Sequence, residues 1–130
     1  MIQPLSFGQV ERRDDVCIVP ISGRLAAGLN DDQLRQRARE IKSLDCRGLV
    51  ADIRALDSIG SSGISFFVEL HTSVTKRPHG RFVLLGPSPR VREILEMTRL
   101  TTILAVAGDL ESALAYCAPP GASATATGSR

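Results

Sequence analysis

Tryptophan is absent from this chain of 130 residues, and aromatic residues make up only 4% of it, with a single tyrosine, Tyr116. Proteins that hold single-stranded nucleic acid usually stack the bases on aromatic side chains, and this chain has little with which to do so. The net charge is also low, at +2, and the basic residues are dispersed among acidic ones. Because no basic stripe forms either, we expect no nucleic-acid partner.

Long apolar runs are absent as well. None approaches the roughly 20 residues that a membrane-spanning helix needs, and the opening Met-Ile-Gln-Pro-Leu-Ser-Phe lacks the basic and apolar regions of a signal peptide. The three cysteines, Cys17, Cys46 and Cys117, make no Cys-x-x-Cys pair. An odd, scattered set is typical of reduced thiols in an intracellular protein. We therefore expect a cytoplasmic protein with no membrane partner.

What the chain does contain fits one α/β domain. Its length and its apolar content of 43% suit a single globular core. Apolar runs predict five strands, and helical periodicity with capping residues predicts four helices. The order ββαβαβαβα predicts a mixed, mostly parallel sheet of about five strands with about four helices packed on it. The expected strands are 5–11, 16–21, 49–53, 82–85 and 103–106, and the expected helices are 31–44, 61–75, 89–98 and 110–116. We assign residues 1–117 to the domain and expect 118–130 to be a disordered tail.

The segment 52–63, Asp-Ile-Arg-Ala-Leu-Asp-Ser-Ile-Gly-Ser-Ser-Gly, joins a predicted strand to a predicted helix. We expect the strand to end at Ile53, a short polar link to follow, and Ser61 to open the helix. Backbone N–H groups are unpaired at a helix start and the helix dipole is positive there, so Ser61 can either cap the helix or carry a phosphate. Ser62 has the same two interpretations, and Ser58 is either a turn residue or a second phosphoacceptor.

Catalysis has little support in the sequence. A nucleophilic serine needs a histidine base, but His71 lies nearly three helical turns beyond the serines and His79 lies in a loop at the far end of that helix. The segment 60–63 matches neither the nucleophile elbow nor a nucleotide-binding loop. The histidines and cysteines have no metal-ligand spacing, and Asp52 with Asp57 would be a poor magnesium pair. We expect no catalytic residue, no metal and no cofactor.

Phosphorylation of Ser61 is the chemistry that remains. It would add about −1.5 to −2 charge where a helix start tolerates it, so the fold would survive while the surface changed sign. Two neighbouring residues stay open to two interpretations. Phe66 belongs either to the core or to a partner-binding patch, whereas Phe67 is expected in the core. Gly63 either lets a partner's backbone approach or relieves crowding in the first helical turn.

The chain resembles the STAS domain, the fold of bacterial anti-sigma factor antagonists, from about Leu5 to Tyr116. The most specific match is Val50–Ile64, which is similar to the family's strand, link and Asp-Ser-Ser-Gly segment, in which the first serine is the phosphoacceptor. A second element, Leu85-Gly-Pro-Ser-Pro with Val91, Leu95, Thr98 and Leu100, and the segment 109–114 are also similar to the family pattern. One departure lies beside the phosphoacceptor, where Gly60 replaces the usual aspartate.

The resemblance implies a non-catalytic switch protein. Unphosphorylated, it would bind an anti-sigma factor with serine kinase activity and so free a sigma factor. The kinase would switch it off by phosphorylating Ser61 (with Ser62 and Ser58 as lesser candidates), and a serine phosphatase would restore it. We expect the protein itself to be a monomer or weak dimer. The alternative is a scaffold STAS protein of a stress-signalling complex that phosphorylation of Ser61 does not regulate. The implied partner-binding surface comprises Asp57, Ser58, Gly60, Ser61, Ser62, Gly63 and Phe66.

Overall fold

The computed structural model describes residues 6–25 and 31–117. In chain order these form β1 (Ser6–Phe7), β2 (Glu11–Arg13), β3 (Val16–Leu25), α1 (Asp31–Lys42), β4 (Gly48–Ile59), α2 (Ser61–Thr75), β5 (Arg81–Leu85), α3 (Pro89–Met97), the 3₁₀ turn η1 (Leu100–Thr102), β6 (Ala105–Ala107) and α4 (Leu110–Cys117). No helix within the described ranges is long and apolar enough to span a bilayer. The predicted disordered tail, 118–130, lies outside the described residues.

One six-stranded sheet runs through the molecule in the order β1-β3-β4-β5-β6, and β2 also pairs with β3. The strands β1 and β2 run antiparallel to β3, whereas β3, β4, β5 and β6 are mutually parallel. Parallel neighbours need crossover connections, which helices supply here. The predicted α/β class and the mixed, mostly parallel sheet are confirmed.

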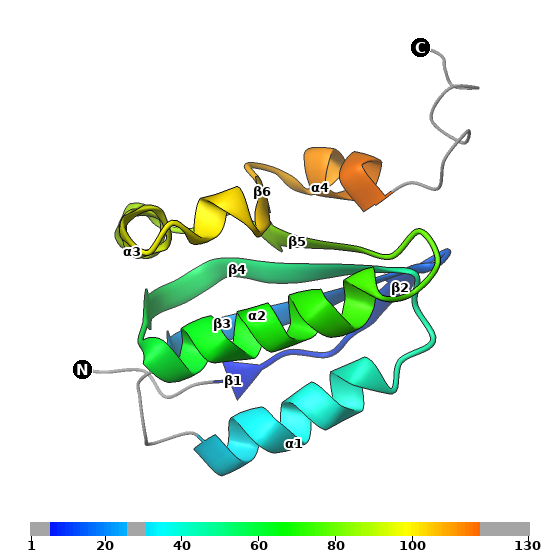
Figure 1. The fold of residues 1–130 in the computed structure, drawn as a ribbon, viewed down its shortest axis with the longest axis horizontal. Helices are drawn as coiled ribbons and strands as arrows, with labels where there is room; N and C mark the ends of the chain where they lie inside the picture. Colours follow the sequence, from blue (N-terminus) through cyan, green and yellow to red (C-terminus); the bar gives the residue numbers. More distant parts are fainter. Residues whose placement is uncertain (1–5, 26–30, 118–130) are drawn as a thin grey trace.

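The helices divide between the two faces of the sheet (Figure 1). On one face α1 and α2 lie side by side and begin at the same end, and their apolar side chains build the larger core around Phe67. On the other face α4 covers a smaller cluster around Val50 and Cys117. Because β4 is covered on both sides, its first four residues are all buried, which explains the continuous apolar run in the sequence.

The central strands are longer than the sequence predicted. Instead of ending at Ile21 and Ile53, β3 and β4 continue to Leu25 and Ile59 and stay paired to their last residues. Two register shifts interrupt this pairing, as β-bulges do. The predicted polar link is therefore mostly strand, and Gly60 alone separates β4 from α2.

Smaller differences appear at the edges of the sheet. The first predicted strand is split into β1 and β2, and Asp14 and Asp15 alone form the turn to β3, because Arg12 and Arg13 pair with β3. The strand β6 begins at Ala105, since Ile103 ends the 3₁₀ turn. Ser88 caps α3, because its hydroxyl accepts a hydrogen bond from the Val91 N–H at 3.3 Å.

The cysteines also differ from expectation. Cys17 of β3 and Cys46, just before β4, are joined in a disulfide whose Cα atoms lie 6.1 Å apart. Both side chains are buried in the larger core. Cys117 is a free thiol buried in the smaller cluster. The prediction of three reduced thiols is therefore wrong for the first two, because the fold brings together residues 29 positions apart in the sequence.

Candidate functional site

The serine pair at the start of α2 sits directly after the last residue of the longest strand. Ile59 is buried at the end of β4, and Gly60 takes the N-cap position of α2 in an extended conformation. The Gly60 carbonyl accepts the first helical hydrogen bond, from the Ile64 N–H at 3.0 Å. Ser61 is consequently the first helical residue and is exposed. The interpretation of Ser61 as the helix cap is wrong, because Gly60 occupies that position.

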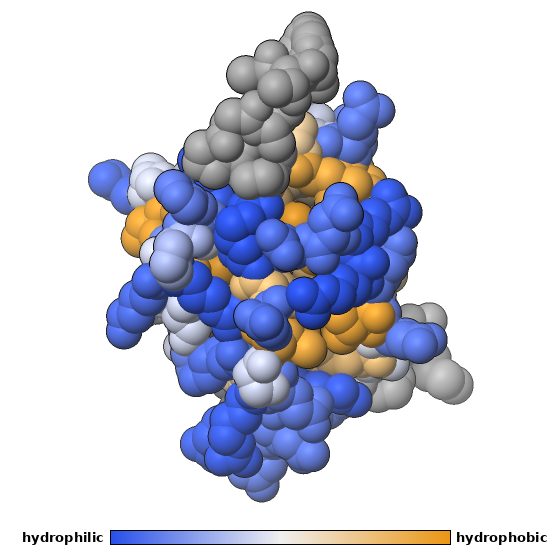
Figure 2. Space-filling model, turned by 90° about the vertical axis from the view of Figure 1, so that its right-hand side faces the viewer, coloured by the Kyte–Doolittle hydropathy of each residue, from blue (hydrophilic) through white to orange (hydrophobic). Residues whose placement is uncertain are grey.

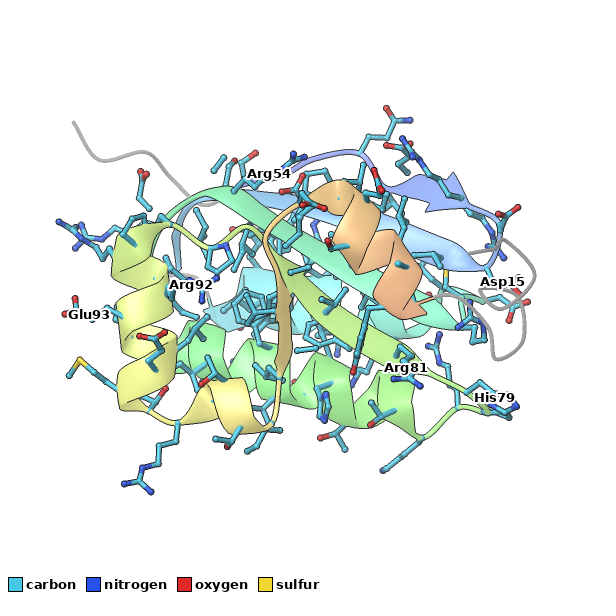
Figure 3. The ribbon with its side chains drawn as sticks, turned by 90° about the horizontal axis from the view of Figure 1, so that it is seen from above. Asp15, Arg54, His79, Arg81, Arg92 and Glu93 are labelled. Carbon is cyan, nitrogen blue, oxygen red and sulfur yellow. A yellow bond between two sulfur atoms is a disulfide. The ribbon has the colours of Figure 1, made fainter. Side chains whose placement is uncertain are left out.

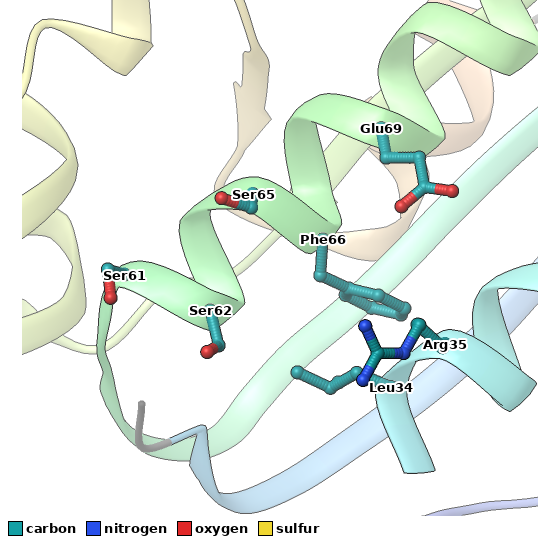
Figure 4. Close-up of a pocket in the computed structure, with 7 residues that line it drawn as sticks. All are labelled: Leu34, Arg35, Ser61, Ser62, Ser65, Phe66 and Glu69. Carbon is teal, nitrogen blue, oxygen red and sulfur yellow. The ribbon is translucent and has the colours of Figure 1, made fainter. Parts of the chain in front are cut away.

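A cleft between α1 and α2 begins at these serines (Figure 4). Its volume is about 290 Å³, and seven side chains line it: Leu34, Arg35, Ser61, Ser62, Ser65, Phe66 and Glu69. In Figure 4 the guanidinium of Arg35 reaches from α1 toward α2, and the two serines lie at one end of the cleft with Glu69 toward the other. The cleft thus offers hydroxyl groups at its open end and charges of both signs on its walls.

Ion pairs of α1 flank this cleft. Near its mouth Arg35 contacts Asp32 at 3.2 Å, and both side chains are largely exposed, so the pair contributes little stability. Toward the other end of α1, Lys42 bridges to Glu69 of α2 at 2.5 Å. This second pair joins the two helices that form the cleft.

Two members of the predicted partner-binding surface are not accessible. Phe66 is 3% exposed, and its ring packs edge to face against Phe7 with the centroids 5.9 Å apart. Gly63 is buried in the first turn of α2, which leaves no room for a partner's backbone. Phe66 therefore belongs to the core, and the burial of Gly63 contradicts the approach of a partner's backbone. The other predicted members, Asp57, Ser58, Gly60, Ser61 and Ser62, are exposed or half-buried around one end of the sheet.

The other polar residues weighed in the sequence lie elsewhere. His71 packs against Phe82 of β5 with the ring centroids 6.4 Å apart, and His79 lies in the turn after α2. Asp52 accepts two hydrogen bonds from the Arg54 guanidinium, at 2.9 and 2.8 Å. Burial raises the pKa of the Asp52 carboxyl, but the bonds and charge of Arg54 outweigh burial and hold that pKa below its ordinary value. Asp52 is thus occupied by a structural ion pair.

Arg35 and Glu69 are the charged cleft residues that the sequence did not reveal. They lie on different helices, 34 positions apart, and no spacing rule within one helix connects them. Among the described residues no three His, Cys, Asp or Glu side chains gather in a way that could hold a metal ion.

Comparison with known proteins identifies the family. The model of the STAS domain matches residues 8–113, so the chain belongs to the STAS domain family. The fold resembles that of an anti-sigma factor antagonist from Mycobacterium paratuberculosis, with a TM-score of 0.75 and 23% identity over 86% of this chain and 92% of that one. No curated protein matches the sequence.

Two further solved structures share this fold. The anti-sigma factor antagonist SpoIIAA in its unphosphorylated form aligns with a TM-score of 0.66 and 20% identity, over 82% of this chain and 92% of that one. A chain of the stressosome, a signal integration and transduction hub, aligns with a TM-score of 0.63 and 25% identity, over 84% of this chain and 95% of that one. The structural neighbours therefore include anti-sigma factor antagonists and a chain of the stressosome.

Proposed function

We propose that this protein is an anti-sigma factor antagonist, a non-catalytic binding module. In this proposal it sequesters an anti-sigma factor serine kinase while Ser61 is unmodified and releases it when Ser61 is phosphorylated. The observation that carries the proposal is the exposed Ser61 at the first position of α2, with the capping position taken by Gly60. Because Ser61 does not cap the helix, its hydroxyl can be modified without loss of the cap.

The switching reaction is an ordinary phosphoryl transfer. The Ser61 Oγ attacks the γ-phosphorus of ATP held by the kinase, and a new O–P bond forms. The bond from the γ-phosphorus to its bridging oxygen breaks, ADP leaves, and the hydroxyl proton passes to a base of the kinase. Phosphorylation adds about −1.5 to −2 charge to this exposed surface. A partner docked there should lose affinity by about 5- to 150-fold, the usual range of such coupling.

The proposal includes a cycle and a compartment. A serine phosphatase returns the protein to its binding state by hydrolysing the phosphoserine. Because the kinase needs ATP and a sigma factor acts on RNA polymerase, the cycle requires a cytoplasmic protein that regulates transcription. Sequestration of the kinase frees the sigma factor, and phosphorylation ends that release.

The test combines mass spectrometry with binding. We expect incubation with the cognate kinase and ATP to place one phosphate on Ser61, and the absence of phosphate there would contradict the proposal. Ser61→Asp should lose kinase binding, whereas Ser61→Ala should remain bound and resist modification. Ser112→Asp is the matched control, because Ser112 is exposed on α4 over the opposite face of the sheet. It should bind the kinase as the wild type does.

A scaffold role is the second candidate, and the likeness to a stressosome chain supports it equally. In that role the domain would assemble with other STAS proteins, and phosphorylation of Ser61 would not regulate it. Light scattering of the full chain, alone and mixed with STAS partners, separates the two. Entry into a large assembly that Ser61→Asp does not disturb would favour the scaffold, whereas a protein that stays monomeric would count against it.

A further inference from the structure

An apolar cavity lies between α1 and the edge of the sheet, apart from the cleft that begins at the serines. Its volume is about 160 Å³, and it shares no lining residue with the cleft. Figure 2 views the end of the molecule at which α1 ends, where apolar side chains reach the surface between hydrophilic ones. We call this space the edge cavity, and five apolar side chains line it: Phe7, Val10, Val19, Ile41 and Leu44.

Its lining distinguishes the edge cavity from two other hollows of the molecule. The cleft between α1 and α2 is lined by three serines and two charged side chains besides its apolar ones. A hollow of about 470 Å³ beside α3 is lined mainly by charged residues, among them Arg92 and Glu93 (Figure 3). Of these three spaces, the edge cavity is the one whose walls suit an apolar ligand.

The cavity forms where the edge of the sheet is interrupted. On this edge of β3, β1 pairs with residues 21 and 22, and β2 pairs with residues 16–18. Val19 and Pro20 lie between the two pairings, where the Gly8 N–H donates to the Pro20 carbonyl at 2.9 Å. Because the chain from Gly8 to Val10 leaves the strand ladder, space remains beside Val19, whose side chain is part of the cavity wall.

The helix α1 provides the opposite wall. Its contribution consists of Arg37, Glu40 and Ile41, and Leu44 follows three residues later, a spacing that keeps all four on one helical face. Leu44 lies just past the end of α1, but its N–H donates to the Ile41 carbonyl at 3.0 Å and so continues the turn. One face of α1 therefore brings apolar and charged side chains to the same cavity.

The two charged side chains lie at the rim and satisfy each other. The side chains of Arg37 and Glu40 are 43% and 50% exposed, and the guanidinium donates to the carboxylate at 3.0 Å. The same guanidinium lies over the ring of Phe7, 5.3 Å from its centroid. Because the pair carries no net charge, a charged ligand would lose its hydration in the cavity without gaining a free opposite charge. The edge cavity therefore favours a neutral ligand.

We propose that the edge cavity is a binding site for a small neutral molecule that carries one aromatic ring. An apolar cavity of about 150 Å³ lined by Leu, Ile and Phe binds benzene and otherwise stays dry, and the edge cavity has nearly the same volume and the same kind of lining. The Phe7 ring in its wall favours an aromatic ligand over an aliphatic one of equal size, because aromatic rings attract each other edge to face or offset. The ligand contacts neither Ser61 nor Ser62.

The test is a titration of the full chain with benzene, followed by carbon-13 NMR of methyl groups. We expect saturable shifts for the methyls of Val10, Val19, Ile41 and Leu44, whereas those of Leu34 in the cleft stay in place. Benzene at about ten times its dissociation constant should raise the melting temperature by about 4 °C. Benzoate has the same ring with a negative charge and should bind at least about tenfold more weakly. Equal binding of benzoate and benzene would overturn the assignment of a neutral ligand.

Val10→Phe is the decisive variant, because Val10 is 39% exposed and a larger side chain there fills the cavity from its mouth without disturbing the core. Leu44→Phe fills it from the side of α1, where Leu44 is half-buried. Each should weaken benzene binding about tenfold or more. Ile103→Phe is the matched control, since Ile103 is 55% exposed and does not line the cavity, and it should bind benzene as the wild type does. Full benzene binding by both filled variants would overturn the proposal.

Light scattering during the titration identifies the occupant. A protein that stays monomeric while the methyl shifts saturate supports a free ligand. A dimer that benzene dissociates would mean that a second copy fills the edge cavity, and would overturn the proposal. Ser61→Asp should bind benzene normally, because the cavity and the cleft share no residue.

Discussion

Gly60 stands directly before Ser61 and holds the N-cap position of α2 with φ −111° and ψ −168°. These are extended angles that any residue adopts, so nothing in the backbone requires a glycine there. An aspartate could place its carboxylate on the free N–H groups of the first turn, as Asp109 does in α4 by accepting from the Ser112 N–H at 2.7 Å. Gly60 therefore leaves α2 without a side-chain cap, although the position suits one.

We predict that Gly60→Asp raises the free energy of unfolding by about 0.5 kcal/mol, the usual difference between a glycine and an aspartate cap with its dipole interaction. The variant also restores the charge that the family carries beside its phosphoacceptor, so a cognate kinase should modify Ser61 faster. Urea unfolding and the initial rate of phosphorylation measure the two effects. Gly60→Ala supplies neither a cap nor a charge, and should leave the rate unchanged.

Gly86 has the opposite property, because its backbone does require glycine. Its φ is +64°, and a Cβ atom there would lie 2.4 Å from Cγ of Arg54. Gly86→Ala should lower the free energy of unfolding by about 1–2 kcal/mol from the left-handed backbone alone, and it should also displace Arg54 from Asp52. Gly108→Ala is the matched control, since a Cβ there meets nothing within 4 Å. Equal stabilities of the two variants would contradict this prediction.

The stability of variants at Phe66 and Ser61 distinguishes cleft residues that belong to the core from those that belong to a contact surface. Because the ring is 3% exposed and packs against Phe7, Phe66→Ala should cost about 3–5 kcal/mol, as large-to-small core substitutions do. Ser61→Asp, one turn away on the exposed face, should change stability by less than about 0.5 kcal/mol. Chemical denaturation of both variants measures the difference. A Phe66→Ala protein as stable as the wild type would contradict the core assignment and favour a place for Phe66 in the partner-binding surface.

The sequence was informative where one element could be judged by itself. Apolar runs located the central strands, and helical periodicity located α2 and α3, because burial leaves its mark on consecutive residues. It underestimated β4 because Leu56 and Ile59 are buried three positions apart, and the register shifts opposite them break the two-residue period. A bulged strand end therefore has the sequence pattern of a polar loop.

The candidate site was only partly predictable for a related reason. Ser61 was found because a serine at a helix start is a local pattern. The capping role of Gly60 follows from the extension of β4 to Ile59, and the presence of Arg35 in the cleft depends on how α1 packs against α2. Packing of this kind brings together residues that are far apart in the sequence, so no spacing pattern predicts their contact.

The disulfide gives a prediction about thiol counts. The protein unfolded without reductant should take up one alkyl group, on Cys117, and with reductant it should take up three, because Cys17 and Cys46 are joined. Intact-mass spectrometry measures both values. Disulfides are rare in the cytosol, so alkylation at the moment of cell lysis also reports on the compartment. Three alkyl groups without reductant would show that the pair is reduced in the cell.

Cys117 should make the protein less stable at alkaline pH. Burial raises the pKa of its thiol from 9.0 to about 11 in the folded chain, despite the opposing charges of Arg47 and Arg81. Between these two values the native protein keeps the thiol proton while the unfolded chain loses it. Stability therefore falls as pH rises through this window, by up to about 1.4 kcal/mol per pH unit, and is unaffected by this group below pH 9.

Cys117→Ala removes the titrating group, so the difference in unfolding free energy between wild type and variant isolates its effect. We expect that difference to be constant from pH 7 to about 8.5 and then to shift steadily in favour of the variant up to pH 11. The loss of volume in the smaller core adds a constant penalty to the variant, which does not alter the slope. Urea titrations at each pH give the two curves. Parallel curves across the whole range would mean that the thiol titrates equally in both states, and that its burial between α4 and the sheet does not raise its pKa.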